Sequence, residues 1–291
     1  MSDPKITIIM AVYNDAALLP FAIRSLQQQT LGSWELILVD DGSSDGSAEI
    51  AEGFGDSRIR VIRNRTNLGL AASLNRAIGM AGAPLIARMD SDDFCYPRRL
   101  EAQYEFLVNH PEVSLVGGQA VMFQDNGAPR GVMRPPTAHE KICRGGLLGN
   151  FPLYHPAWMG RTGWFRRNEY DPTFRKSQDY ELLLRASATS IYANLPEIVL
   201  GYRYGLGNLR KRLMSRRFTV KAQVKNLLLR GRFYDFAVGV SVVLAKGIAD
   251  ILCVITRGAK RRRHSLEEIS GSEKACWNTV CANIGLNKNS G

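Results

Sequence analysis

Apolar runs of strand length alternate with amphipathic helical segments along the first two hundred residues. The runs occupy residues 6–12, 34–39, 58–62, 84–89 and 113–122. Segments with apolar residues three and four positions apart lie between them, at residues 18–26, 47–54, 70–80 and 97–109. Runs that are apolar on both faces are typical of parallel strands, and helices of this length suit crossover connections. The pattern therefore predicts an α/β domain built on a mostly parallel sheet.

The pattern changes near residue 205. Residues 208–230 and 233–256 have the spacing of two helices, whereas residues 264–291 are polar and rich in Gly, Asn and Ser. We therefore predict a globular domain over residues 1–205, a helical region over residues 206–263, and a poorly ordered tail over residues 264–291.

The positive charge of the chain is concentrated in the helical region. The net charge is +11, but residues 208–263 hold fifteen Lys and Arg against two acids. In the second helix, Asp235, Lys246 and Asp250 share an arc of roughly 60°, and the rest of the circumference is apolar. This amphipathic pattern predicts binding to an anionic membrane surface. Packing of the helix on the globular domain and a membrane-spanning helix are the alternatives.

Composition also restricts the setting and the partners. Five widely spread cysteines without a C-x-x-C pair indicate neither a disulfide framework nor a cysteine zinc site. Residues 1–5 are polar and precede a strand, so we expect no secretory signal and a cytoplasmic location on the inner face of a membrane. Nucleic-acid binding is not expected, because few aromatic residues are interleaved with the basic ones.

Polar side chains follow three of the predicted strands. Tyr13 follows the first, two acids at residues 40–41 follow the second, and three acids lie within residues 90–93. Parallel strands collect ligands at their carboxyl ends, so these side chains should converge. The chain lacks the Gly-rich motifs that cradle phosphates. Clustered carboxylates repel a diphosphate unless a divalent cation lies between them, which predicts Mg²⁺ or Mn²⁺.

The motifs that carry these side chains resemble those of the family 2 glycosyltransferases. They lie in residues 8–14, 39–45, 67–71, 89–93, 155–159, 170–172 and 174–182. The resemblance covers roughly residues 5–205, and nothing comparable supports residues 206–291. It implies an inverting enzyme with a GT-A, Rossmann-like, three-layer α/β/α domain for a nucleotide-diphospho-sugar.

The resemblance also implies how the nucleotide is bound. Tyr13 would stack on the nucleobase, Asp41 would accept a hydrogen bond from the base edge, which suits uracil, and Asp90 would contact the ribose. Tyr13 has the alternative of packing on the first helix. Asp40 is as well suited to capping the Asp-Gly-Ser turn as to binding a ligand.

Three residues are candidate metal ligands by the same resemblance. Asp92 is the first candidate, and Asp93 competes with it because family members differ in which acid of this cluster binds the metal. His155 would supply a third ligand, although a lone histidine is often structural.

Asp179 is the candidate catalytic base. It lies at the predicted start of a helix, and Gln178 stands where the family usually has an acid, so no rival base remains there. An inverting transfer needs a carboxylate that takes the proton of the acceptor hydroxyl. The alternative is an Asp that only stabilises the helix N-terminus. Glu181 is expected to face solvent or to form a salt bridge.

The expected function is metal-dependent transfer of a sugar, with inversion, from a nucleotide-diphospho-sugar, UDP-linked in our prediction. The acceptor would be a saccharide or lipid-linked saccharide in cell-surface polysaccharide biosynthesis. One alternative is a non-catalytic nucleotide-sugar-binding homologue that recruits partners at the membrane. The other is a nucleotidyltransferase, which would release pyrophosphate instead of a nucleoside diphosphate.

Overall fold

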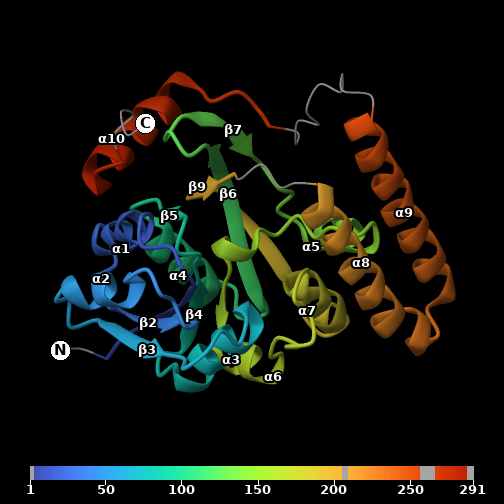
Figure 1. Ribbon diagram of the computed structural model, residues 1–291, viewed down its shortest axis with the longest axis horizontal. Helices are drawn as coiled ribbons and strands as arrows, with labels where there is room; N and C mark the ends of the chain where they lie inside the picture. Colours follow the sequence, from blue (N-terminus) through green and yellow to red (C-terminus); the bar gives the residue numbers. More distant parts are fainter. Residues whose placement is uncertain (1–2, 205–208, 256–265, 287–291) are drawn as a thin grey trace.

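The computed structural model describes residues 3–204, 209–255 and 266–286 (Figure 1). The strands are β1 (Ile6–Val12), β2 (Trp34–Asp40), β3 (Ile59–Arg63), β4 (Leu85–Arg88), β5 (Phe94–Cys95), β6 (Leu115–Phe123), β7 (Pro129–Met133), β8 (Met159–Arg161) and β9 (Tyr192–Arg203). The helices are α1 (Leu19–Gln27), α2 (Ser47–Gly53), α3 (Leu70–Met80), α4 (Arg99–Asn109), α5 (His139–Leu147), α6 (Thr162–Arg167), α7 (Gln178–Ala186), α8 (Leu209–Asn226), α9 (Phe233–Ile255) and α10 (Gly271–Ile284). Two short 3₁₀ turns are His155–Ala157 and Leu228–Arg230.

All nine strands form one sheet in the order β3-β2-β1-β4-β8-β6-β9-β5, and β7 pairs with β6. The pairs β1–β2, β1–β4, β2–β3 and β6–β9 are parallel. Val12 at the end of β1 lies opposite Asp40 at the end of β2, and Ile9 lies opposite Arg88 at the end of β4. The sheet therefore brings these three strand ends to one edge, as the sequence predicted.

Helices cover both faces of the sheet. Alternate residues of β1, such as Ile8 and Met10, point to the face covered by α1 and α4, while Ile9 points to the face covered by α3. All three side chains are buried. The predicted three-layer α/β/α arrangement is confirmed. Between β6 and α7, where the sequence offered no prediction, the chain adds β7, α5, β8 and α6.

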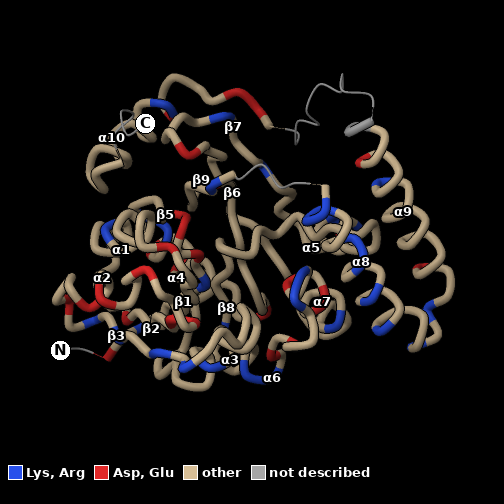
Figure 2. Tube along the Cα trace, viewed as in Figure 1, with Lys and Arg blue, Asp and Glu red and all other residues tan. Residues whose placement is uncertain are grey.

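Helix α9 packs on α8 through its polar arc. Asp250 is buried and forms ion pairs with Arg216 at 2.5 Å and with Arg212 at 3.5 Å, both on α8. Lys246 Nζ donates to the carbonyl oxygen of Leu148 at 2.9 Å. Lys and Arg residues lie along the length of α8 (Figure 2). The predicted packing alternative is thus present in the structure, with the charged side of α9 turned inward.

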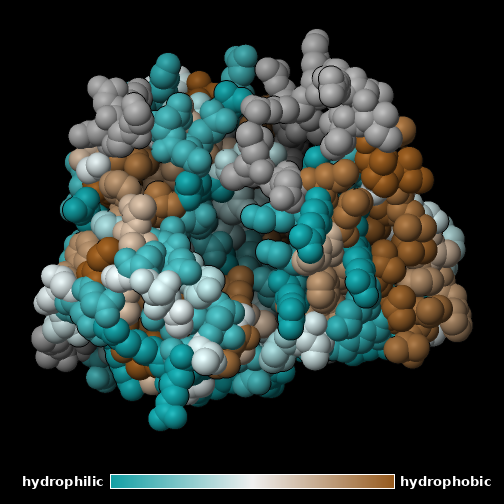
Figure 3. Space-filling view, in the orientation of Figure 1, coloured by the Kyte–Doolittle hydropathy of each residue, from teal (hydrophilic) through white to brown (hydrophobic). Residues whose placement is uncertain are grey.

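The opposite side of α9 is apolar and exposed (Figure 3). Its exposed side chains, together called the α9 apolar face, are Phe233, Tyr234, Leu244, Ile248, Ile251 and Leu252. No helix in the described ranges is long and apolar enough to cross a membrane. The basic run at residues 257–263 lies outside the described residues.

The predicted disorder of residues 264–291 is wrong for the part that the structure describes. Helix α10 begins with a capping box between Ser270 and Glu273, and it returns to lie beside α1 and β5 (Figure 1). Trp277 is fully buried, and its ring centroid lies 5.1 Å from that of Phe94. The physical reason is an apolar stripe at helical spacing, formed by Trp277, Val280, Cys281 and Ile284.

We expect the substitution Trp277→Ala to lower the free energy of unfolding by about 3–5 kcal/mol, because it removes a large buried side chain and leaves a cavity. Urea denaturation followed by circular dichroism measures this change. The neighbouring exposed residue gives a matched control, since Asn278→Ala should change stability by less than about 0.5 kcal/mol. Equal stability of the two variants would show that α10 does not pack on the domain.

Candidate active site

The loops after β1 and β2 are joined by hydrogen bonds that fix Tyr13 at the sheet edge. Asn14 has a left-handed backbone, with φ of 51°. Its N–H donates to Ser43 Oγ at 3.0 Å, and its side-chain oxygen accepts from the N–H of Ser44 at 2.9 Å. Tyr13 is 53% exposed, so about half of its surface is open to a ligand. Its stacking on a nucleobase stays a prediction.

The carboxylate of Asp41 anchors the loop that leads into α3. Its Oδ1 accepts from Asn64 Nδ2 at 2.8 Å, from Ser73 Oγ at 2.9 Å and from the N–H of Leu68 at 2.9 Å. Its Oδ2 accepts from the N–H of Gly69 at 2.8 Å. A carboxylate has about four acceptor positions shared by its two oxygens. Oδ1 already accepts three hydrogen bonds, whereas Oδ2 accepts one. A contact between Asp41 and a base edge stays a prediction, and it would have to use Oδ2.

Asp40 caps the turn that follows β2. Its Oδ1 accepts from the N–H of Ser43 at 3.2 Å, and the side chain is buried. Asp40 therefore caps the Asp-Gly-Ser turn, which was one of its two predicted roles.

Three carboxylates meet at the end of β4. One oxygen from each of Asp90, Asp92 and Asp93 lies within 4.8 Å of the other two. Asp90 forms a bidentate ion pair with the buried guanidinium of Arg88, in which Nη1 donates to Oδ2 at 2.7 Å. Ser91 Oγ donates to Asp15 at 2.6 Å, which ties this acid cluster to the loop after β1. Asp90, Asp92 and Asp93 are called the acid cluster below.

Burial and mutual repulsion raise the pKa of two carboxyl groups of this cluster. Burial, together with the charges of Asp90 and Asp15, raises the pKa of Asp92 to about 6. The pKa of Asp93 is raised well above its ordinary value, by burial and then by Asp92 and Asp90. Asp93 Oδ1 accepts from the N–H of Arg203 at 2.8 Å, while its buried Oδ2 has no partner among the described residues. An unpartnered oxygen beside two further carboxylates fits a hard divalent cation such as Mg²⁺ or Mn²⁺.

His155 does not join the acid cluster. Its Nε2 shares a hydrogen bond of 2.6 Å with the hydroxyl of Tyr170, and its ring lies edge-on to Trp158. Burial and the charge of Arg88 hold the pKa of His155 well below its ordinary value, so the ring is neutral. His155 therefore has a structural role, which was the alternative to metal binding, and it is not grouped with the three acids.

Asp179 lies in the first turn of α7, beside the backbone N–H groups of residues 179 and 180. Burial raises its pKa, while these donors and the charge of Arg88 lower it. Since Asp90 also acts on its pKa, Asp179 lies within electrostatic reach of the acid cluster. Glu181 is different, because it is fully buried and bonded to both Arg185 and Lys225 at 3.1 Å. Of the two predicted outcomes for Glu181, the salt bridge is found.

Sequence reasoning missed Arg88, Tyr170 as the partner of His155, and Arg203. A signal existed for Arg88, which is a charged residue inside a buried strand and therefore needs a partner. The partnerships of Tyr170 and Arg203 depend on tertiary contacts and leave no local pattern.

Comparison with known proteins identifies the family. The model of glycosyl transferase family 2 matches residues 7–168, more than half of the chain. The chain belongs to glycosyl transferase family 2. The match ends before α7 and the C-terminal helices, so Asp179, α8, α9 and α10 lie beyond it.

Relatives and solved structures agree with this family. The chain is 37% identical to EpsE of Bacillus subtilis over 190 residues, which are 63% of this chain and 67% of that protein. It is 32% identical over 150 residues, 52% of this chain and 57% of the relative, to the UDP-Glc:alpha-D-GlcNAc-diphosphoundecaprenol beta-1,3-glucosyltransferase WfgD of Escherichia coli. The mannosyltransferase PcManGT of Pyrobaculum calidifontis, solved with GDP-Man and Mn²⁺, shares the fold, with a TM-score of 0.62 at 15% identity. That match covers 98% of this chain and 86% of PcManGT.

We expect Mn²⁺ to raise the melting temperature more above pH 7 than at about pH 5. The pKa of Asp92 is raised from 3.8 to about 6. At pH values between these two, the folded state therefore binds more protons than the unfolded state. The stability contributed by this group falls as pH rises through that range. A cation replaces the lost protons and restores the stability.

Scanning fluorimetry with and without Mn²⁺ measures this effect. Asp92→Asn should remove most of the Mn²⁺-dependent rise, whereas Glu112→Gln, which changes an exposed acid elsewhere, should retain it. An equal rise at both pH values would contradict a cation site at the acid cluster.

Proposed function

We propose that this family 2 glycosyltransferase moves a sugar from a UDP-linked donor to a hydroxyl of a saccharide or lipid-linked saccharide, with inversion and with help from a divalent cation. One observation carries the proposal: Asp90, Asp92 and Asp93 each offer an oxygen within 4.8 Å of the others, and a buried oxygen of Asp93 has no partner among the described residues. This is a candidate cation site, and the charge of Asp90 also acts on the pKa of Asp179, the candidate base. The printed names of WfgD, with a UDP-Glc donor and a diphosphoundecaprenol-linked acceptor, and of PcManGT, with Mn²⁺, support the substrate classes and the cation.

Asp92 and Asp93 would hold the cation, and Asp90, fixed by Arg88, would contact the ribose. The cation supplies positive charge that offsets the negative charge of the diphosphate leaving group. The raised pKa values of Asp92 and Asp93 support this assignment, because carboxylates that repel one another gain most from a shared cation. Tyr13 would stack on the uracil ring at the same sheet edge.

Asp179 would act as the general base. A base works best when its pKa lies near the working pH, and burial moves the pKa of Asp179 in that direction. The backbone N–H groups of α7 and the charge of Arg88 act in the opposite direction and favour the ionised carboxylate. Its oxygen would take the proton of the acceptor hydroxyl while the hydroxyl oxygen bonds to the anomeric carbon. The diphosphate leaves from the opposite side, and this single displacement inverts the anomeric centre.

Asp179→Asn should bind UDP-glucose as the wild type does, but lose about 10²–10⁴-fold in the rate of UDP release, because the general base is gone. Calorimetry measures binding, and a coupled assay for UDP measures turnover. Gln178→Ala, one residue earlier in the same turn, is the matched control and should retain turnover. Near-normal turnover by Asp179→Asn would contradict the assignment of the base.

The two alternative functions predict different products. Pyrophosphate release by the wild type would indicate a nucleotidyltransferase. Donor binding without any turnover would indicate a non-catalytic binding protein.

We also propose that the α9 apolar face lies on an anionic membrane, at its cytoplasmic side. A helix of an ordinary soluble domain turns its apolar side to the core, whereas α9 turns Asp250 and Lys246 inward. Leu244 and Ile248 are 57% and 60% exposed on the outer side. The exposed basic residues just before α9, Arg230 and Arg232, would add about 1 kcal/mol each near anionic lipids.

The double variant Leu244→Asp, Ile248→Asp should lose the salt-resistant part of membrane binding. Wild-type protein should sediment with phosphatidylglycerol vesicles and be only partly released by 1 M salt, because screening to a Debye length of about 3 Å removes attraction but not insertion. Val108→Asp, on the exposed part of α4, is the matched control. Full release of the wild type by salt would contradict insertion of α9.

A further inference from the structure

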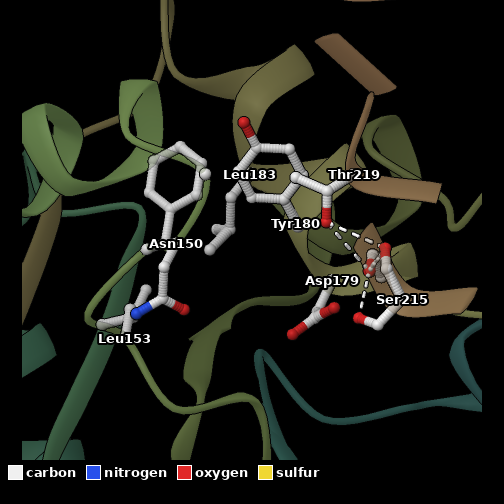
Figure 4. Close-up of a pocket in the computed structure, with 10 residues that line it drawn as sticks. Asn150, Leu153, Asp179, Tyr180, Leu183, Ser215 and Thr219 are labelled. Carbon is white, nitrogen blue, oxygen red and sulfur yellow. Dashed lines mark hydrogen bonds between the residues drawn. The ribbon is translucent and has the colours of Figure 1, made fainter. Parts of the chain in front are cut away.

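A cavity of about 160 Å³ is lined on one side by Asp179 (Figure 4). Three segments form its wall. They are the loop after α5 at residues 149–153, the start of α7 at residues 177–183, and one side of α8 at residues 215–219. The Asp179 carboxylate and the Asn150 amide face the open space from opposite sides (Figure 4). Asp179 lines this cavity, and the charges of Asp90 and Arg88 also act on its pKa.

Three hydroxyl groups form one polar wall of the cavity. Ser177 Oγ lies 2.9 Å from Ser215 Oγ and 3.3 Å from Thr219 Oγ1. Ser177 is the residue before α7, where a serine usually caps the helix, but its side chain makes no capping bond. It has a left-handed backbone, with φ of 56°, and its hydroxyl turns to α8 instead. An unfavourable backbone conformation that joins two elements at one cavity is typical of a binding site.

The lining selects the chemistry of a ligand. None of the described lining residues is Lys or Arg, and Asp179 is the one charged group among them, so an anionic ligand such as a phosphate is disfavoured. Each hydroxyl has one donor and two acceptor positions, which leaves capacity for further hydrogen bonds. The rings of Phe151 and Tyr180, with centroids 5.7 Å apart, supply an apolar side. Polar edges and apolar faces together are the properties of a neutral sugar ring.

The size of the cavity fits one ring. A cavity of about 150 Å³ in another protein holds a benzene molecule, so 160 Å³ has room for one six-membered ring. We infer that this cavity is the acceptor subsite and that it holds one neutral monosaccharide, whose reacting hydroxyl faces Asp179. The inference rests on the proposed function, since it takes Asp179 as the base. Ser215 and Thr219, from a helix beyond the family match, are then specificity-determining residues.

The cavity is close to the helix that carries the α9 apolar face. Gly149 lines the cavity and packs so closely against Val243 of α9 that a side chain at this position would clash. Lys246 of α9 bonds to the carbonyl of the preceding residue, Leu148. A sugar on a lipid carrier and a free saccharide present the same ring to such a cavity, so the two sources need separate measurements.

Saturation-transfer NMR on the full chain with UDP and Mn²⁺ tests the inference. The probes are the methyl β-glycosides of glucose, galactose, mannose and N-acetylglucosamine, each also supplied as a dodecyl glycoside in phosphatidylglycerol vesicles. We expect binding of at least one sugar. Tighter binding of the vesicle-borne form would identify a lipid-linked source, and equal binding a free saccharide. Both results support a sugar site.

Two variants locate the binding. Ser215→Leu fills the cavity and should abolish glycoside binding, while Thr219→Val removes one hydroxyl and should weaken it by about tenfold. Thr279→Val is the matched control for Thr219→Val, because each threonine bonds to the carbonyl four residues earlier in its own helix, at 3.1 Å. Melting temperatures confirm folding, and Thr219→Val keeps the test valid if Ser215→Leu does not fold.

The outcomes separate this inference from the proposed function. If the wild type binds UDP-glucose but none of the glycosides, or if both variants bind glycosides as the wild type does, the inference is overturned and the proposed function stands. If the wild type does not bind UDP-glucose, the proposed function fails as well. The UDP-glucose affinity of the variants should match that of the wild type.

Discussion

Repulsion among three carboxylates at the end of β4 is the constraint on which the site depends. The surrounding structure offsets it with buried cations and donors instead of solvent. Arg88 neutralises Asp90, and the N–H of Arg203 bonds to Asp93. Arg99 is almost completely buried behind the cluster, and its Nη2 donates to the carbonyl of Arg88 at 2.7 Å. A buried carboxylate oxygen without a donor lowers the stability of the fold. Such an oxygen is typical of a site where a bound cation or substrate supplies the missing partner.

A second pair of charges determines how the C-terminal region is used. Asp250 of α9 is held by Arg216 of α8, and this pairing turns the charged arc of α9 toward the protein. The apolar side of α9 is left outside as a result. Helix α8 is held against α7 by other contacts, since Lys225 bonds to Glu181 at 3.1 Å and Ser177 bonds to Ser215. Helix α8 thus supports both the surface proposed to meet the membrane and a wall of the cavity beside Asp179.

The sequence predicts the sheet better than it predicts the roles of single side chains. Strand β1 and helix α3 have the predicted bounds, because a strand buried on both faces and an amphipathic helix leave distinct periodicities. The convergence of the ends of β1, β2 and β4 is also predicted, because parallel strands end at the same edge of a sheet. The neutral hydrogen bond of His155 is not, since it depends on a residue fifteen positions away. Helix α10 was hidden for another reason: its apolar stripe is short and lies within a polar composition.

In the proposed function the donor and the acceptor are held by different parts of the chain, and the family match covers only the part that would hold the donor. The matched part, residues 7–168, contains the acid cluster and the loops after β1 and β2, where a nucleotide-diphospho-sugar would bind in any member. Asp179, the proposed base, and the hydroxyls of α8 lie beyond it. In the proposed function a nucleotide-diphospho-sugar needs the same groups whatever the acceptor is, whereas the residues that meet an acceptor have to differ with it. The proposed acceptor residues of this chain accordingly come from α8, the helix that also holds α9.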